Sequence, residues 1–292
     1  MELSKTAERT VRLSAFLRAE LRLSHTLVNR LKVQNAIFVN GSPVHTDYIV
    51  VPGEVVSVRI EEPEPDYPAE PGALHILYED AAVIALDKPS GILMHPSHSR
   101  NTGTLANYLA YYYRETGQKC AVHPVSRLDR DTFGVVLLAK NAYTHARLCD
   151  AHAEGTIEKT YHAAVWGAPP VDAGVIDLPI VRLSPIGMLR GVGAGGQRAV
   201  TEYRVLRRTR YGALVELHPR TGRTHQLRVH LAHLGCPILG DPQYGTAQSQ
   251  AYSLAHGLET QQLCAAALRY PHPLDGSLRT LHSAQHVILP ED

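Results

Sequence analysis

The segment EEPEPDYPAEPGA, residues 61–73, constrains the architecture more than any other part of the sequence. It contains four prolines, five acidic residues and no basic residue. Proline fixes φ and removes a backbone donor, and repelling carboxylates keep a chain extended, so this composition disfavours both helix and sheet. We therefore expect a stiff, solvated linker over residues 61–73 that separates a small unit, residues 1–60, from a larger one, residues 74–292.

The charge of the protein is distributed unevenly around that linker. The chain of 292 residues has a formal net charge of only +1, but residues 1–60 hold eight basic and five acidic residues. A local basic surface can bind nucleic acid even where the net charge of the whole protein is near zero. The sequence thus leaves room for a nucleic-acid partner on the first unit.

Several protein classes are disfavoured by what the sequence lacks. No apolar run approaches the roughly 20 residues needed to cross a bilayer, and the start MELSKTAERT has no apolar signal-peptide core. The four cysteines form no C-x-x-C pair, so we predict neither a disulfide nor a structural metal. We expect a soluble, cytoplasmic protein without a membrane partner, acting as a monomer.

The first unit has the pattern of a small α/β domain. LSAFLRAEL has leucines and Phe16 on one helical face, and Ser24 is a helix N-cap for the segment that follows it. Residues 36–60 predict strands, with Asn40-Gly41 forming a tight hairpin. Together with Pro52-Gly53-Glu54, this order resembles the S-four-type RNA-binding module over residues 11–60. The resemblance implies RNA contacts through the cationic side chains Arg18, Arg22, Arg30 and Lys32.

The second unit alternates between strands and helices, with strands in excess. Residues 75–89 predict two strands around a turn at Glu79-Asp80, and TLANYLAYYYRETG predicts a helix. A strand within residues 126–140 and the strand KTYHAAVWG flank the helix NAYTHARLCDAHAEG, and THQLRVHLAHLG predicts another helix. Because many strands are neighbours in sequence, we expect an α+β fold with a mixed, largely antiparallel sheet.

One stretch of this unit combines charge with a buried strand. In SRLDRDTFGVVLLAK, residues 126–140, Asp129 stands between Arg127 and Arg130 just before an apolar run. Nearby guanidinium groups favour the ionised form of a carboxylate. An anion in that place suits a nucleophile, a general base or a structural ion pair, and the stretch alone leaves all three open.

Five ordered stretches resemble the RluA family of RNA pseudouridine synthases, over roughly residues 74–289. They are DKPSGILMHP, the stretch around Asp129, KTY at 159–161, RTGRTHQLRVHLAHLG and GDPQYG. The resemblance implies that the protein isomerises uridines in structured RNA to pseudouridine, without a cofactor. It favours ribosomal RNA of the large subunit as the target, with transfer RNA second.

The resemblance also implies roles for individual side chains. Asp129 would be the covalent catalyst, and Arg223 would pair with it. Tyr161 would lie against the target ring and Leu227 beneath the base, while Arg127 would fill the space of the extruded uridine. Whether Asp129 attacks C1′ or C6, or removes the 2′ proton to give a glycal, remains open.

Three positions depart from the family pattern, and two other functions compete with catalysis on RNA. Ser126 and Cys264 stand where the family usually has histidine, and Phe133 stands where a small or polar residue is usual. A non-catalytic ribosome-assembly factor would keep the same fold. A metallohydrolase is weaker, because His225 and His230 would lie about 140° apart around a helix and would not converge on one ion.

Overall fold

The computed structural model describes residues 1–97, 100–184 and 186–291. Its helices are α1 (Leu13–Ala19), α2 (His25–Val33), α3 (Leu105–Glu115), α4 (Ala142–Ala153), α5 (Gln226–His233) and α6 (Ala247–Ala255). Its strands are β1 (Glu2–Thr6), β2 (Val11–Arg12), β3 (Ile37–Val39), β4 (Ser42–Pro43), β5 (Ile49–Val50), β6 (Val55–Arg59), β7 (Ile76–Glu79), β8 (Val83–Lys88), β9 (His123–Pro124), β10 (Phe133–Ala139), β11 (Glu158–Trp166), β12 (Ala173–Asp177), β13 (Ile180–Arg182), β14 (Arg190–Val192), β15 (Val200–Arg208), β16 (Gly212–Pro219), β17 (Leu263–Pro271) and β18 (Leu278–His282). Within these ranges, no helix is both long and apolar enough to cross a membrane.

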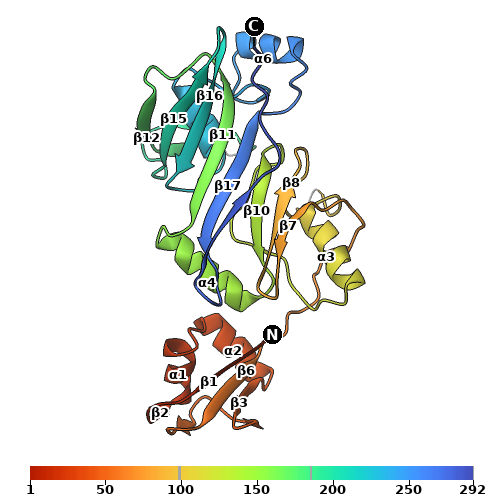
Figure 1. The fold of residues 1–292 in the computed structure, drawn as a ribbon, viewed down its shortest axis with the longest axis vertical. Helices are drawn as coiled ribbons and strands as arrows, with labels where there is room; N and C mark the ends of the chain where they lie inside the picture. Colours follow the sequence, from red (N-terminus) through yellow and green to blue (C-terminus); the bar gives the residue numbers. More distant parts are fainter. Residues whose placement is uncertain (98–99, 185, 292) are drawn as a thin grey trace.

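The N-terminal unit, residues 1–60, folds around its own apolar core. A four-stranded sheet in the order β1-β6-β3-β4 packs with α1 and α2 (Figure 1). Ser24 caps α2 by accepting a hydrogen bond from the backbone of Leu27 at 3.2 Å, as its side-chain type predicts. Asn40 and Gly41 both have positive φ between β3 and β4, which confirms the predicted hairpin.

The larger unit is built on one ten-stranded sheet. Its main path runs β12-β15-β16-β11-β17-β10-β8-β7, with β18 beside β17 and β9 beside β10. Every pairing in it is antiparallel except that of β10 with β17. The predicted mixed, largely antiparallel α+β fold is therefore confirmed. The sequence did not predict β17, which lies at the centre of the sheet (Figure 1).

The parallel pairing joins two antiparallel halves of the sheet and is very short. Only Phe133 with Cys264 and Gly134 with Ala265 are in register. Gly134 has φ of +106°, and a side chain there would collide with the backbone of Ala265. Glycine is required because the two strands approach too closely for any Cβ. The stretch around Asp129 thus enters the sheet at the junction between its two halves.

Residues 61–73 contain no helix or strand, but the prediction that the segment is fully solvated is wrong at Glu62. The Glu62 side chain is only 2% exposed. It accepts two hydrogen bonds from Arg30 in α2, at 2.9 and 3.3 Å, and one from the backbone of Ala142, at 2.9 Å. A carboxylate of the linker therefore connects the N-terminal unit with the start of α4.

The end of the chain returns to the first strands of the larger unit. Asp87 in β8 accepts hydrogen bonds from the Ser283 hydroxyl, the Ala284 backbone and the Gln285 amide, at 2.7, 2.8 and 2.7 Å. Gln285 also donates to the carbonyl oxygen of Lys88 at 3.0 Å. The segment DKPSG is thereby tied to residues almost 200 positions later.

Candidate active site

Asp129 lies in the loop that leads into β10, with its side chain 30% exposed. Its Oδ2 atom accepts a hydrogen bond from Nη1 of Arg228 in α5 at 3.2 Å. The Arg228 side chain is only 6% exposed. A charge-assisted bond from a buried guanidinium fixes the orientation of the carboxylate. The geometry therefore presents an accessible anion on a rigid support.

Arg228 is itself held by the motif GDPQYG. Its Nε and Nη2 atoms donate to the two oxygens of Asp241 at 2.7 and 2.9 Å, and Nη2 also donates to Gln243 at 2.9 Å. The guanidinium lies 4.9 Å from the ring centroid of Tyr244. Burial alone would lower the pKa of Arg228, but its bonds to Asp241 and Asp129 outweigh burial and raise it. Arg228 therefore remains a cation.

The prediction that Arg223 pairs with Asp129 is wrong. Arg223 is exposed, and its Nε donates to the carbonyl oxygen of Arg198 at 3.0 Å. It lies in the turn before α5, whereas Arg228 lies inside the helix and is buried. His225 between them has positive φ, so the chain changes direction after Arg223. The two arginines of one motif consequently point to different places.

The neighbouring arginines do not hold Asp129 either. Arg130 makes a bidentate pair with Asp131, with both distances 2.9 Å, and Arg127 is exposed. The cation at Asp129 comes instead from a residue 99 positions away. The predicted ionic environment of Asp129 is thus supplied by tertiary structure and not by its own loop.

Tyr161 and Leu227, the two apolar residues predicted for the site, belong to the core of the larger unit. Both are buried in the core cluster that also contains Leu128. Tyr161 stands opposite Ala265 of β17, which in turn stands opposite Gly134. Burial raises the pKa of the Tyr161 phenol well above its usual value, and the negative charge of Asp129 adds to this effect. Tyr161 is therefore protonated at neutral pH.

DKPSG supports the Asp129 loop from behind. The Lys88 side chain is buried, and its ammonium donates to the carbonyl oxygens of Pro89, Ile92 and Arg130, at 2.9, 2.9 and 2.8 Å. Ser90 donates to the carbonyl of Asp131 at 3.0 Å. Burial lowers the pKa of Lys88 to about 8, against the opposing charges of Asp131 and Asp129. These bonds tie DKPSG to the backbone of the two residues that follow Asp129.

Sequence reasoning did not identify four residues that build the site: Lys88, Arg228, Asp241 and Tyr244. All four lie inside motifs that the sequence displays, so a signal was present. Asp241 is the clearest case, because an acidic residue in an otherwise uncharged GDPQYG needs a partner if it is buried. Its side chain is fully buried, and its partner is Arg228.

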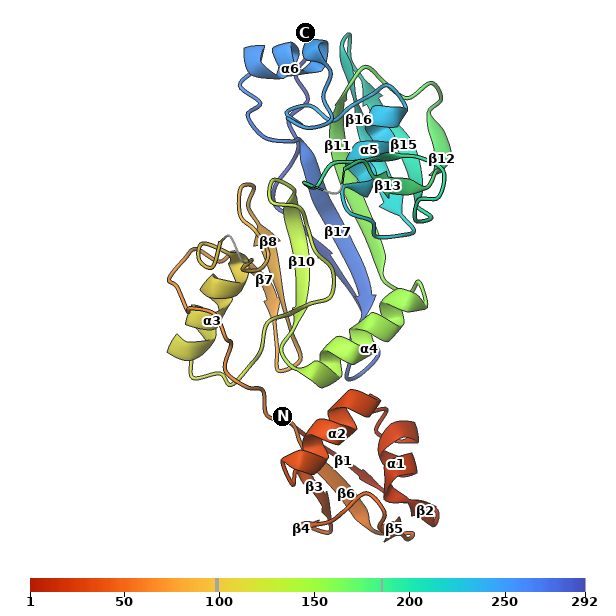
Figure 2. The same ribbon diagram turned by 180° about the vertical axis from the view of Figure 1, so that it is seen from behind.

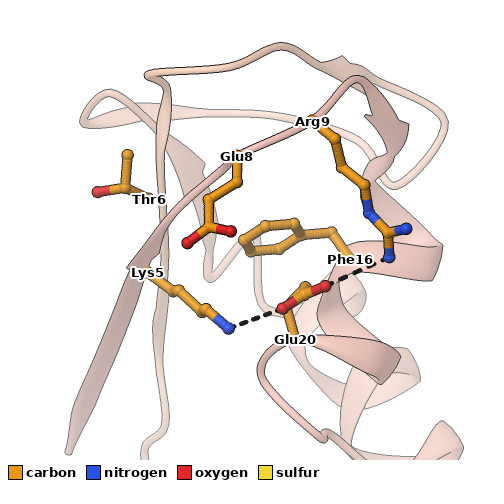
Figure 3. A pocket seen from close by; sticks show the side chains of 6 residues that line it. All are labelled: Lys5, Thr6, Glu8, Arg9, Phe16 and Glu20. Carbon is orange, nitrogen blue, oxygen red and sulfur yellow. Dashed lines mark hydrogen bonds and ion pairs between the residues drawn. The ribbon is translucent and has the colours of Figure 1, made fainter.

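The basic residues of the N-terminal unit differ in availability. Arg18, Arg22 and Lys32 are exposed on or beside α1 and α2. Arg30 is already paired with Glu62 and is 29% exposed. A hollow of about 260 Å³ in the same unit has Phe16 among its lining residues, and its two cations Lys5 and Arg9 both pair with Glu20 (Figure 3). That hollow lies outside the larger unit and shares no residue with the Asp129 site.

The two histidines considered above as metal ligands, His225 and His230, both contact protein groups. His230 contacts Thr201 Oγ1 at 2.9 Å and the carbonyl of Leu178 at 3.0 Å through its two ring nitrogens. His225 contacts the Tyr244 hydroxyl at 2.8 Å. These contacts hold the start of α5 against the 241–245 turn and its middle against β15, near which α5 lies in Figure 2. The helical spacing assumed for the pair is wrong at His225, which precedes α5 with a positive φ.

Comparison with known proteins identifies the family of this chain. The RNA pseudouridylate synthase family matches residues 82–233. The chain is 37% identical to "Uncharacterized RNA pseudouridine synthase YlyB" of Bacillus subtilis (strain 168), covering 92% of this chain and 87% of that one. It is 34% identical to "Ribosomal large subunit pseudouridine synthase D" of Vibrio cholerae, covering 87% and 82%.

A solved structure has a similar fold. "Human RNA Pseudouridylate Synthase Domain Containing 1" superposes with a TM-score of 0.60 at 26% identity, covering 74% of this chain and 86% of that one. The region of this chain that matches the family, residues 82–233, includes the Asp129 loop, Tyr161 and Arg228. The chain thus belongs to the RNA pseudouridylate synthase family, and it is an enzyme that isomerises uridine in RNA to pseudouridine.

Proposed function

We propose that Asp129 is the covalent catalyst of this isomerisation and that Arg228 has the role predicted for Arg223. The observation that carries the proposal is one partly exposed carboxylate held by a buried arginine beside an apolar wall. An ionised, oriented carboxylate can act as nucleophile or base without further activation. Tyr161 would lie against the uracil ring, and Leu227 would lie beneath it.

The target uridine must leave the RNA stack before its ring can reach Asp129. Enzymes that act on a base extrude it into a pocket at a cost of a few kcal/mol, which contacts to the displaced neighbours offset. Arg127 is exposed two residues before Asp129. Its guanidinium can fill the gap left in the stack and pair with the phosphates on either side.

The chemistry then breaks the N1–C1′ bond, turns the uracil within the site and joins C5 to C1′. Attack of Asp129 at C1′, attack at C6 and removal of the 2′ proton are all compatible with its position. Tyr161 is not a resting base at neutral pH, because burial keeps its phenol protonated. Its roles are to pack against the ring and, once the C5 proton becomes acidic, to assist its transfer.

The RNA target is inferred from the relatives. Because several are named as synthases of the large ribosomal subunit, ribosomal RNA of that subunit is our first choice and transfer RNA the second. We place the enzyme in the cytoplasm and expect it to act as a monomer.

Residues 1–60 would anchor the RNA as an S-four-type domain, joined by residues 61–73 to the catalytic domain, residues 74–292. Arg18, Arg22 and Lys32 are exposed cations suited to phosphates. Arg30 contributes only if RNA displaces Glu62 from it. Phosphate contacts of this kind position a protein without reading sequence, so site selection would fall to the catalytic domain.

The test is tritium release from RNA labelled at uracil C5 and isolated from cells that lack the enzyme. C5 loses its hydrogen only when it bonds to C1′. Wild type should release tritium and Asp129→Asn should not, while Asp131→Asn, which removes only the partner of Arg130, should retain release. If wild type binds RNA tightly but releases nothing, the protein is an assembly factor and the proposed catalysis is wrong.

A further inference from the structure

His225 combines an unusual backbone conformation with a position next to Asp129. Among the described residues, four that are not glycine have positive φ, and the other three, Arg22, Asn35 and Asn40, belong to the N-terminal unit. His225 has φ of 58° and ψ of 20° at the start of α5. Residues held in this region cost free energy and concentrate at functional sites. The conformation directs its ring back toward the Asp129 loop.

The ring of His225 is held by a chain of hydrogen bonds. The backbone N–H of Arg190 donates to the Tyr244 hydroxyl at 3.0 Å, and that hydroxyl lies 2.8 Å from Nδ1 of His225. Because the phenol oxygen already accepts a bond from Arg190, its own proton is available for Nδ1. A neutral imidazole that accepts at Nδ1 carries its hydrogen on Nε2. We assign this tautomer to His225 because it also directs an N–H, and not a lone pair, toward the Asp129 carboxylate.

The hydrogen on Nε2 faces one particular oxygen of Asp129. Nε2 lies 3.9 Å from Oδ2, and Oδ2 is also the atom that accepts the bond from Arg228. Among the hydrogen bonds of residues 1–97, 100–184 and 186–291, none reaches Oδ1 of Asp129. The two oxygens of the carboxylate are thus distinct, since one is directed at the protein and the other is available to substrate.

We propose that His225 is a positioning residue which, together with Arg228, holds Oδ2 of Asp129 and leaves Oδ1 as the oxygen that reacts with the uridine. The inference rests on the proposed role of Asp129. This arrangement is compatible with each of the three reactions left open for Asp129, because each of them uses one carboxylate oxygen. Oδ1 either forms a bond to C1′ as N1–C1′ breaks, or bonds to C6 as the ring electrons move toward the C4 carbonyl, or accepts the 2′ proton.

This arrangement also predicts a pH dependence. The groups that face His225 are Asp129 from its loop, Arg228 from α5, Asp241 and Tyr244 from the 241–245 turn, and Arg190 from β14. Burial lowers the pKa of His225, and the charge of Asp129 opposes this only in part. The ring is neutral at neutral pH. On acidification it becomes a second cation beside Oδ2, which draws electron density from the carboxylate and slows the reaction.

The experiment measures single-turnover tritium release by the full-length enzyme from the C5-labelled RNA, between about pH 4.5 and 8. His225→Gly keeps the positive-φ backbone and removes only the ring. We expect its maximal rate to fall by about ten- to hundredfold, as for other lost orienting partners, with the half-saturating enzyme concentration unchanged within about twofold. The acid limb of its profile of rate against pH should move to lower pH.

Two further variants keep the test informative if His225→Gly is poorly folded. The amide of His225→Gln can still donate to Oδ2, so part of the rate should return without the histidine titration. Tyr244→Phe removes the donor to neutral Nδ1, which favours the protonated ring, so the acid limb should move to higher pH. A rate within about twofold of wild type and an unmoved acid limb in these variants would overturn the proposal. Tritium release by Asp129→Asn would instead overturn the role of Asp129 itself.

Discussion

Arg228 and Arg30 each bind a buried carboxylate, but the two pairs do different work. Arg228 is 6% exposed and joins Asp129, Asp241 and Gln243 within the catalytic unit. Arg30 is 29% exposed and joins the N-terminal unit to Glu62 of the linker. The first arrangement orients the Asp129 carboxylate, whereas the second ties a carboxylate of the linker to the N-terminal unit. Loss of the first should stop chemistry, and loss of the second should alter stability and RNA binding.

The largest effect is expected from Arg228→Met. It leaves Asp241 buried without its partner, which typically costs about 3–5 kcal/mol of folding stability. It also releases Asp129, so tritium release should be lost. Arg223→Met is the matched control and should retain stability and turnover. Urea unfolding and tritium release on both variants decide between the two arginines, and the reverse pattern would restore the original prediction for Arg223.

Glu62→Gln should have an intermediate effect on stability. Burial alone would raise the pKa of Glu62, but hydrogen bonds from His123, Arg30 and Ala142 lower it to about 2. Because this value lies below that of the unfolded chain, the stabilisation is fully present above about pH 4.5 and is lost as the pH falls toward 2. Urea unfolding should show a smaller loss of stability between pH 5 and 3 in Glu62→Gln than in wild type. Parallel losses would show that Glu62 is not a stabilising contact.

A smaller effect concerns two departures from the family pattern, Phe133 and Cys264. They are in register across the β10–β17 junction, and both are buried. Their side chains share one face of the sheet, so a larger residue at 264 must compete with Phe133 for space. Cys264→His alone should cost about 1–3 kcal/mol. Adding Phe133→Ser should recover part of that cost, and strictly additive effects would mean that the two positions are independent.

The smallest expected effect is on the salt dependence of RNA binding, in which the exposed cations should differ from Arg30. If Arg18 and Arg22 each neutralise one phosphate, Arg18→Gln and Arg22→Gln should each reduce the slope of log affinity against log salt by about 1. Arg30→Gln should reduce it less, because Glu62 already neutralises that guanidinium. A filter-binding titration at several salt concentrations measures all three. Equal slopes in all variants would remove the N-terminal unit from the phosphate contacts.

The sequence predicted those elements that depend on the intrinsic preferences of neighbouring residues. Ser24, Asn40-Gly41 and the apolar run after Phe133 have strong intrinsic preferences, and the structure has the predicted cap, hairpin and strand there. β17 was not predicted, because LCAAALRYP has neither alternation nor many β-branched residues. It forms a strand because it is enclosed by β10 and β11. Tertiary context overrides propensity at the very centre of the sheet.

The same holds for the site residues: their identities could be predicted from local motifs, but their partners depend on tertiary structure. Asp129, Tyr161 and Leu227 could be named from the motifs, and in the structure the charge of Asp129 acts on Tyr161, while Tyr161 and Leu227 belong to one apolar core. Which arginine meets Asp129 could not be read from RTGRTHQLR, because the answer depends on the backbone turn at His225. The burial of Glu62 was hidden for a similar reason. Its partners Arg30 and Ala142 lie in two different units, and no pattern in a Pro-rich acidic segment indicates either.

The contact between Asp87 and residues 283–285 has a consequence for synthesis of the enzyme on the ribosome. Residues 1–60 can complete their core early, since their contacts are local in sequence. DKPSG, which supports the Asp129 loop, gains its last hydrogen bonds only after Gln285 has been synthesised and has folded back onto β8. Pairings so distant in sequence form late. The core of residues 1–60 can therefore form before the support of the Asp129 loop is complete, so the two units need not fold at the same time.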